Sequence, residues 1–277
     1  MKSQWECLLE NLGVWEGSFT IFSPQGELLQ DTPSILSLEG LNNNQKVRLT
    51  LRRFPPNQPV NELVQEYNSL SRSLLFFENG AFSQGAMQLG LFSEFGAEFS
   101  LIYGNRRLRL VQLFDKSGQL DTITLIREHL AETNTPEKPQ LTVNDLLGNW
   151  HGEVVTIYPD WHYNTYNSHL QIQLDDSGRL IQKLSFGSRT ITSTAKVNGS
   201  IILFDQEPEK QVQVLLLPGG ASATSPLKVQ LRQPLFLEVG WLIEPDLRQR
   251  MIRSYNEKGE WVSLSLVTER RVVSDNL

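Results

Sequence analysis

Cysteine is almost absent from this sequence, since Cys7 is the only one in 277 residues. A single cysteine cannot form an intrachain disulfide, so a reducing compartment is expected, and it cannot supply the thiolates of a short zinc motif. The four histidines show no metal-ligand spacing either. We therefore expect no metal and no cofactor.

Catalytic motifs, long apolar runs and basic patches are missing as well. The sequence has no Gly-x-Ser-x-Gly motif and no Ser/His/Asp spacing, so it offers no catalytic residue to name. No apolar run approaches the roughly 18 residues of a membrane span, and residues 1–6 lack the apolar core of a signal peptide. A formal net charge of −6 gives no footprint for nucleic acid. These absences predict a cytoplasmic protein without membrane insertion or a nucleic-acid partner, and they disfavour an enzyme.

Two copies of one motif are the main feature present. The first copy, at residues 12–22, contains Trp15, and the second, at residues 147–158, contains Trp150. In each copy a glycine stands two positions after the tryptophan, and an apolar, strand-like run follows. Because side chains alternate faces along a strand, that glycine leaves room for the indole to lie across its own strand. The arrangement resembles the first strand of the calycin barrels, the lipocalins and fatty-acid-binding proteins, and predicts an indole that plugs one end of each barrel.

The rest of the chain also divides into two similar halves. An amphipathic helix is expected over residues 4–12, with a counterpart at residues 143–147. About nine strand-like segments follow in the first half and ten in the second. The hairpin at residues 109–120 aligns without a gap with the hairpin at residues 250–261. An internal duplication accounts for this agreement.

Polar, proline-containing residues 132–140 are expected to link the two halves. The sequence therefore predicts two domains, residues 1–131 and 141–277. The predicted fold is all-β, with two tandem lipocalin- or calycin-like antiparallel β-barrels, each preceded by a short N-terminal helix. Within the second domain, the glycine- and serine-rich residues 217–226 are expected to form a long hairpin loop before a strand at residues 227–231.

Two arginines are predicted to cover the indoles. Calycins commonly stack an arginine of the last strand on the tryptophan of the first strand. Arg127 and Arg270 lie on the apolar face of the two last strands, which we expect to face into each barrel. The prediction is therefore Arg127 over Trp15 and Arg270 over Trp150, as structural plugs.

The chain resembles one family in particular, the two-barrel lipocalin-like proteins of cyanobacteria and plastids known as DUF3598. The residues that carry the resemblance are Trp15-Glu16-Gly17, Phe82-Ser83, Leu125-Ile126-Arg127-Glu128, Leu237 to Leu242, Arg248 to Tyr255 and Gly259-Glu260-Trp261. The resemblance covers essentially the whole chain and implies two calycin-type barrels, with no established activity for most members. It also implies a protein partner, because a plastid relative acts as an assembly factor for ATP synthase by protein contact. The motifs of the more distant bilin-attaching calycins are not found in this sequence.

A few residues are candidates for holding a ligand. Arg250 and Arg253 point to opposite faces of one strand, so one of them is expected inside the barrel, as Arg109 is in the first half. A guanidinium in an apolar barrel can hold a carboxylate, and Tyr255 and Trp241 are grouped with these arginines. The alternative is that the arginines pair with carboxylates on the surface.

An aromatic segment at residues 158–169 is a second candidate. Its residues Trp161 and His162 could stack on a planar ligand or anchor a partner. The alternative is that the segment folds over an otherwise exposed core.

Three functional classes stay open from the sequence. The first is a non-catalytic interaction or assembly module with a protein partner. The second is a carrier or sensor of an apolar or anionic small molecule held in a barrel, and the third, least favoured, is an isomerase or lyase. Solid barrel interiors favour the first class, whereas a cavity of about 300 Å³ or more with a convergent arginine favours the second.

Overall fold

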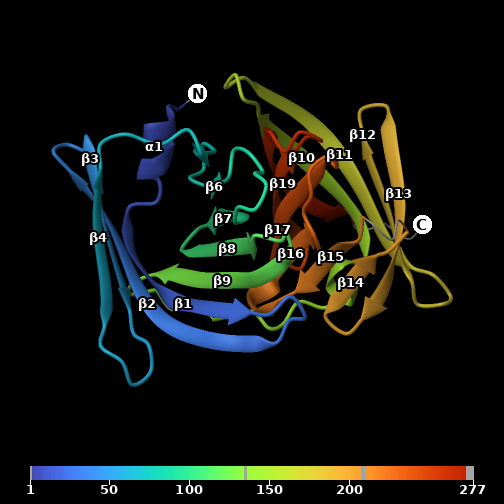
Figure 1. Cartoon of the computed structure of the whole chain (residues 1–277), viewed down its shortest axis with the longest axis horizontal. Coiled ribbons are helices and arrows are strands. Elements are labelled where there is room, and N and C mark those ends of the chain that lie inside the picture. Colours follow the sequence, from blue (N-terminus) through green and yellow to red (C-terminus); the bar gives the residue numbers. More distant parts are fainter. Residues whose placement is uncertain (1, 134–135, 207–209, 273–277) are drawn as a thin grey trace.

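The fold is almost entirely β (Figure 1). A computed structural model describes residues 2–133, 136–206 and 210–272. The first half contains α1 (Gln4–Leu9), β1 (Gly13–Phe22), β2 (Leu28–Leu41), β3 (Lys46–Arg53), β4 (Asn61–Tyr67), β5 (Leu74–Phe76), β6 (Phe82–Gly85), β7 (Phe95–Tyr103), β8 (Arg106–Phe114) and β9 (Leu120–Leu130). The second half contains η1 (Asn144–Leu146), β10 (Gly148–Ile157), β11 (Tyr163–Leu174), β12 (Leu180–Phe186), β13 (Arg189–Asn198), β14 (Ile201–Phe204), β15 (Val212–Leu216), η2 (Pro218–Gly220), β16 (Ala221–Pro226), β17 (Leu235–Glu244), β18 (Leu247–Tyr255) and β19 (Trp261–Val272). The predicted all-β class is confirmed.

The two halves differ in how their sheets end. In the second half β10 to β19 form a closed barrel, whereas the first half has a nine-stranded sheet in the order β4-β3-β2-β1-β9-β8-β7-β6-β5. The outer strands β4 and β5 of that sheet do not pair with each other. The second half is therefore the predicted barrel, and the first half is an open sheet that curls in the same way.

The extra strand β14 explains this difference. Strands β5 and β15 are equivalent, because each leads into the same turn: the N–H of Phe77 donates to the carbonyl of Ala81, and that of Leu217 to the carbonyl of Ala221, both at 2.8 Å. In the second half β14 pairs with both β13 and β15. In the first half only residues 68–73 connect β4 to β5, and they contain no strand.

A tryptophan closes the base of each half. Trp15 and Trp150 are 1% and 0% exposed. Each indole N–H donates to a carbonyl four residues earlier in the chain, that of Asn11 or Leu146, at 2.9 Å. The helix before the first tryptophan ends at Leu9, earlier than predicted, and its counterpart is only the 3₁₀ turn η1.

The glycine- and serine-rich segment is not the predicted loop. Its residues 221–226 form β16, a strand of the barrel that is buried almost throughout. The small side chains of Ala221 and Ala223 let the first half approach closely, and the side-chain amide of Gln112 on β8 donates to the carbonyl of Thr224 at 3.1 Å. A pattern of small residues thus marks a contact between halves rather than a flexible hairpin.

The halves meet across a pseudo-twofold junction. The N–H of Leu89 donates to the carbonyl of Gly259, and the N–H of Val229 donates to the carbonyl of Gly118, both at 2.8 Å. Leu89 and Val229 occupy equivalent places in the two halves, as do the two turn glycines. Residues 227–231, predicted as a strand, form no strand and make part of this contact instead.

A second pair of backbone hydrogen bonds follows the same pseudo-twofold relation between the halves. The N–H of Trp261 donates to the carbonyl of Met87 at 2.9 Å, and the N–H of Leu120 donates to the carbonyl of Leu227 at 3.0 Å. Each half thus pairs one loop with the last hairpin of the other half. This is the geometry of the self-complementary interface in a symmetric dimer.

A continuous apolar core fills the junction. Strands β7 and β8 of the first half contact β16, β17 and β18 of the second. Phe99 and Leu110 on one side and Val239 and Met251 on the other are each 0% exposed and belong to one cluster. The two halves therefore share this core, in addition to a smaller cluster around Trp15 in the first half and another around Trp150 in the second.

A buried arginine also joins the halves. Arg253 on β18 is 0% exposed, and no described carboxylate forms an ion pair with it. Its guanidinium donates to the carbonyls of Gly85 and Ala86, at 3.2 and 3.4 Å, and to the hydroxyl of Tyr255 at 2.9 Å. That hydroxyl donates to the Ala86 carbonyl at 2.8 Å. The loop after β6 is thus held by two residues that were predicted to hold a ligand.

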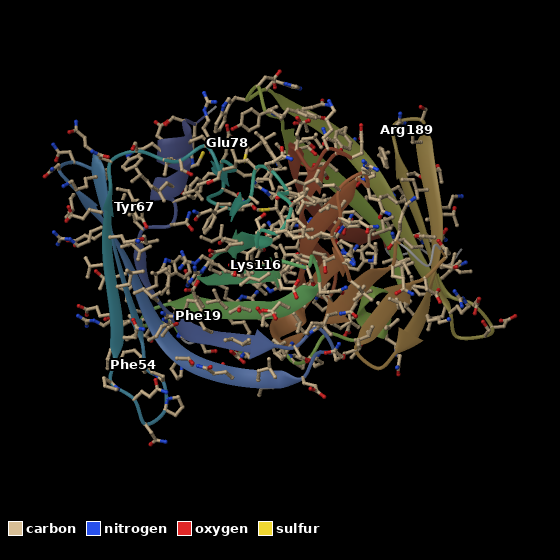
Figure 2. All side chains as sticks on the ribbon, in the orientation of Figure 1. Phe19, Phe54, Tyr67, Glu78, Lys116 and Arg189 are labelled. Carbon is tan, nitrogen blue, oxygen red and sulfur yellow. The ribbon has the colours of Figure 1, made fainter. Side chains whose placement is uncertain are left out.

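Replacing Arg253 tests this junction. Arg253→Met keeps most of the side-chain volume but leaves the Gly85 carbonyl without its donor, so we expect a loss of about 1–3 kcal/mol in the free energy of unfolding. The exposed Arg189, labelled in Figure 2, provides the matched control, and Arg189→Met should change stability by less than about 0.5 kcal/mol. Urea denaturation of both variants makes the comparison, and equal effects would contradict the assigned role of Arg253.

Candidate functional site

In the first half an arginine lies between the base tryptophan and a buried carboxylate. The Arg107 Cζ atom is 4.3 Å from the Trp15 ring centroid, and Arg107 Nε donates to Glu128 at 2.8 Å. Arg109 lies two residues further along β8 and therefore points to the same side. It donates to the other oxygen of Glu128 at 3.0 Å and to Glu98 at 2.8 Å. The formal charges of these two arginines and two glutamates cancel.

The second half repeats this network. The Arg248 Cζ atom is 4.7 Å from the Trp150 ring centroid, and Arg248 Nε donates to Glu269 at 2.7 Å. Arg250 donates to Glu269 at 2.9 Å and to Glu238 at 3.1 Å. The three residues on β18 and β19 each lie 141 positions after their counterparts (248 − 107, 250 − 109 and 269 − 128). The duplication has therefore kept the charged network as well as the tryptophan.

The arginines keep the buried carboxylates ionised. Burial raises the pKa of Glu128, but the charges of Arg109 and Arg107 and their hydrogen bonds outweigh it and lower that pKa to about 2. The same balance lowers the pKa of Glu269. Burial lowers the pKa of Arg109, but Glu128 and Glu98 outweigh it and raise the value. None of these groups is poised to exchange a proton near neutral pH.

The predicted plug arginines lie elsewhere. Arg127 ion-pairs with Glu137 at 2.7 Å, and Arg270 is exposed. Arg107 and Arg248 take the places over the indoles, and Arg271 also lies 4.4 Å from the Trp150 ring centroid. The prediction was wrong because the apolar faces of β9 and β19 pack into the junction, not into the interior of each half.

Each half contains a cavity beside its charged network. The first has a volume of about 460 Å³ and is lined by apolar residues of α1, β2, β3, β5 and β6, together with Arg109 and Glu98. The second has a volume of about 510 Å³, with Arg250 and Glu238 in its wall. Arg109 and Arg250 thus reach the interior, but each is already paired with two carboxylates.

The aromatic segment does not contribute to these cavities. Trp161 is 41% exposed, and His162 contacts Asp160 and stacks on the ring of Tyr158 with 4.3 Å between centroids. Neither Trp161 nor His162 lies in the wall of either cavity. They form a turn on the surface between β10 and β11.

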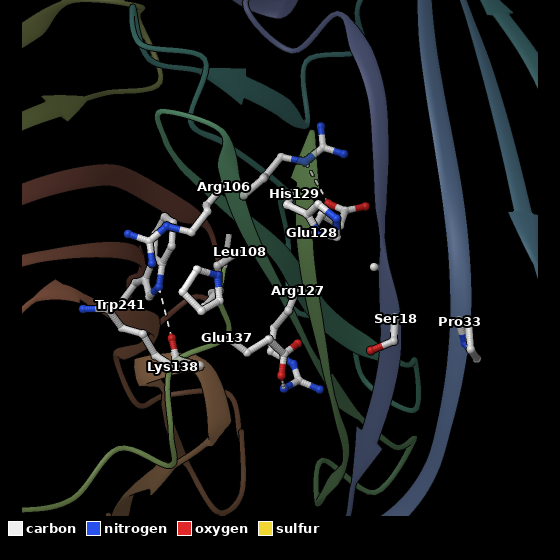
Figure 3. A pocket seen from close by; sticks show the side chains of 14 residues that line it. Ser18, Pro33, Arg106, Leu108, Arg127, Glu128, His129, Glu137, Lys138 and Trp241 are labelled. Atoms are coloured by element: carbon white, nitrogen blue, oxygen red, sulfur yellow. Dashed lines mark hydrogen bonds and ion pairs between the residues drawn. The ribbon is translucent and has the colours of Figure 1, made fainter. Parts of the chain in front are cut away.

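A groove of about 310 Å³ follows the junction of the two halves (Figure 3). Trp241 forms part of its wall and donates from its indole N–H to the carbonyl of Gly219 at 3.2 Å. Figure 3 shows Arg106 beside this indole, and the Arg106 Cζ atom is 5.5 Å from the ring centroid. Arg107, Arg127 and Lys138 also line the groove, as do Glu128 and Glu137, which pair with Arg107 and Arg127. Arg106 and Lys138 carry no sequence pattern that separates them from other surface cations, and only the fold brings them together.

Two kinds of site are not found in the described part of the chain. Among residues 2–133, 136–206 and 210–272, no group of three or more His, Cys, Asp or Glu side chains is arranged to hold a metal ion. Over the same residues, every helix is too short or too polar to cross a membrane.

Comparisons with known proteins match both halves. Residues 1–133 match the N-terminal model of a domain of unknown function, DUF3598, and residues 137–272 match the C-terminal domain of Biogenesis factor required for ATP synthase 1. A DUF3598-family protein of unknown function from Nostoc punctiforme is 68% identical in sequence. That match covers 98% of this chain and 100% of the Nostoc chain, with a TM-score of 0.94.

A more distant structure is the S-type phycobiliprotein lyase CPES from Guillardia theta. It is 17% identical, and the match covers 48% of this chain and 91% of that chain with a TM-score of 0.35. Among curated proteins, none is significantly similar to this chain.

The charged network predicts a specific loss of stability in acid. The pKa of Glu128 is about 2 in the folded chain and ordinarily 4.5, so its charge stabilises the fold above pH 4.5, and that contribution disappears as the pH falls toward 2. Glu128→Gln should lower the free energy of unfolding at pH 7 by about 3–5 kcal/mol, because it leaves two arginines without their shared carboxylate. Its stability should then fall less steeply than that of the wild type between pH 4.5 and 2.

Urea denaturation over this pH range measures both effects. Glu39→Gln is the control, because the Glu39 side chain is 59% exposed, and we expect it to change stability by less than about 0.5 kcal/mol. A Glu128→Gln variant with the wild-type pH dependence would contradict the assigned ion pairs.

Proposed function

Because the chain belongs to the DUF3598 family, we propose that it is a non-catalytic, protein-binding factor that assists the assembly of an ATP synthase. The observation that carries this proposal is the match of residues 137–272 to the C-terminal domain of Biogenesis factor required for ATP synthase 1. We place the protein in the cytoplasm, since a chain whose one cysteine is Cys7 has no intrachain disulfide that would need an oxidising compartment.

The chemistry of the interior supports a non-catalytic role. A catalytic acid or base needs a pKa near the working pH. The buried carboxylates Glu128 and Glu269 have lowered pKa values, and each is bound by two arginines. The carboxylates of the charged network in each half are therefore held in ion pairs, which supports a structural role for the network.

The junction supports a role in binding a large partner. A shared apolar core, four reciprocal backbone hydrogen bonds and the buried Arg253 hold the two halves together. These contacts hold the surfaces of the two halves, and the groove between them, in a fixed arrangement. A preorganised surface binds a protein with less loss of conformational freedom than a flexible one.

A second candidate function is the carriage of a small apolar molecule. The observation that favours it is the cavity of about 510 Å³ in the closed barrel, whose wall combines apolar residues such as Leu184 and Phe204 with Lys228 and Arg250. Its volume lies within the usual range of ligand sites. Against it stands the pairing of Arg250 with Glu238 and Glu269, which leaves that arginine no free charge for an anion.

Binding to isolated subunits tests the assembly proposal. The purified chain is mixed in turn with each purified water-soluble subunit of the ATP synthase from the same organism, and complexes are detected by size-exclusion chromatography with light scattering. We expect a stable complex with at least one subunit, and none with a lipocalin-fold protein of similar net charge as the negative control. A strain that lacks the gene should accumulate less assembled ATP synthase at unchanged subunit messenger levels.

Native mass spectrometry of the chain purified from its own organism separates the two candidates. Added mass from a small molecule, without complexes in the binding experiment, would favour the carrier. Absence of any subunit complex together with normal assembly in the deletion strain would overturn the assembly proposal.

A further inference from the structure

We propose that the junction groove binds an acidic segment of a protein partner, whose carboxylates pair with Arg106 and Lys138. The inference rests on the proposed protein-binding function and names the surface that performs it. Three features support it. Two cations of the groove lack an ion-pair partner, the groove differs in charge from the chain as a whole, and the cations come from separate segments.

Arg106 and Lys138 are half-buried cations without an ion-pair partner among the described residues. The guanidinium of Arg106 lies over the Trp241 ring and donates to the carbonyl of Ile243 at 3.4 Å. Burial and the charge of Arg106 lower the pKa of Lys138 and outweigh the opposite effect of Glu244 and Asp145. Partly desolvated cations are costly unless an anion pairs with them, so carboxylates from another chain would relieve a cost that the free protein carries.

The groove already holds one carboxylate in this way. Arg127 donates to Glu137 of the linker at 2.7 Å, and the side chain of Glu137 is 64% exposed. Arg127 is only 18% exposed, and its Nε has no hydrogen-bond partner. The chain's own acidic residue therefore shows the chemistry that the two unpaired cations of the groove can offer to a partner.

The cations are a local feature and not a consequence of the duplication. The chain has a formal net charge of −6, whereas the groove is lined by four Arg or Lys residues and only two glutamates, Glu128 and Glu137. By the offset of 141 positions that relates β8 and β9 to β18 and β19, Arg106 corresponds to Leu247 and Arg127 to Thr268. The pseudo-equivalent side of the junction thus lacks these charges.

The walls of the groove suit a peptide better than a small inorganic anion. Figure 3 shows Arg106 and Arg127 on different sides of Leu108, which is itself buried, and the exposed Pro33 lies at the far edge of the groove, beyond Ser18. A phosphate ion would need several donors that converge on one point. Arg106 on β8 and Lys138 in the linker are held by separate segments of the chain, and such cations match carboxylates spaced along a peptide.

The test uses the full chain and a fluorescent hexaglutamate peptide as the probe, with binding measured by anisotropy at low ionic strength. Arg106→Gln combined with Lys138→Gln should weaken binding at least about tenfold. The matched control combines Lys116→Gln with Arg189→Gln, two exposed cations labelled in Figure 2, and should weaken binding less than about twofold. Both double variants change the net charge equally, so their difference isolates the groove.

Two results of the peptide experiment would overturn the proposal. One is an equal loss in the control, which would assign binding to overall charge. The other is complete competition by inorganic phosphate at equimolar concentration, which would assign the groove to a small anion. If an ATP synthase subunit binds the wild type and the groove variant equally, the groove inference fails and the proposed function stands. If the peptide binds in the groove but no subunit forms a complex, the proposed function fails instead.

Discussion

The interaction on which both halves depend is an arginine held between an indole and a carboxylate. Arg107 lies over Trp15 and pairs with Glu128, and Arg248 repeats the contact over Trp150. These contacts tie the first strand of each half to the last two strands at the base. A buried charge of this kind is stable only if it is paired and hydrogen-bonded, so the second arginine and the second glutamate of each network are part of the same requirement. The interior of each half is consequently occupied by groups that bind one another.

The junction imposes a second constraint, because the two halves are related there as the protomers of a symmetric dimer are. Equivalent loops pair with equivalent hairpins, and the turn glycines Gly118 and Gly259 allow the close approach: a Cβ atom at Gly118 would lie 2.3 Å from the carbonyl oxygen of Val229. The two sides of the junction differ in the charges that they carry. Arg106 and Arg127 line the groove on one side, whereas Leu247 and Thr268 occupy the equivalent positions on the other side.

Much of this architecture could be predicted from the sequence. The repeated tryptophan motif and the ungapped final hairpins identified two β-sheet halves, and strand parity placed Arg250 and Arg253 on opposite faces. The direction of the apolar face could not be predicted, because an apolar row on β9 fits a barrel interior and a junction between halves equally well. For that reason Arg127 was predicted to lie over Trp15, whereas Arg107 is found there. The small residues of β16 were wrongly predicted to form a loop for a similar reason. Their small side chains are explained by packing against the other half, which the sequence pattern alone does not show.

A signal for the charged networks was present in the sequence. Arginines and a glutamate recur at a constant offset, whereas Arg127 and Arg270 do not. The cations of the groove had no such signal, because they come from β8, β9 and the linker and meet only in the folded chain. A site whose residues occur in only one half leaves no repeated pattern in the sequence. Such a site is therefore harder to predict than a duplicated one.

The most direct measurement of the central claim is a double-mutant cycle between Arg107 and Glu128, with Arg107→Met and Glu128→Leu, by urea denaturation at pH 7. If the two side chains stabilise the fold by pairing with each other, each single variant costs about 3–5 kcal/mol, and the double variant costs at least about 2 kcal/mol less than their sum. Costs that add to within about 0.5 kcal/mol would contradict the account, because the two charges would then act independently.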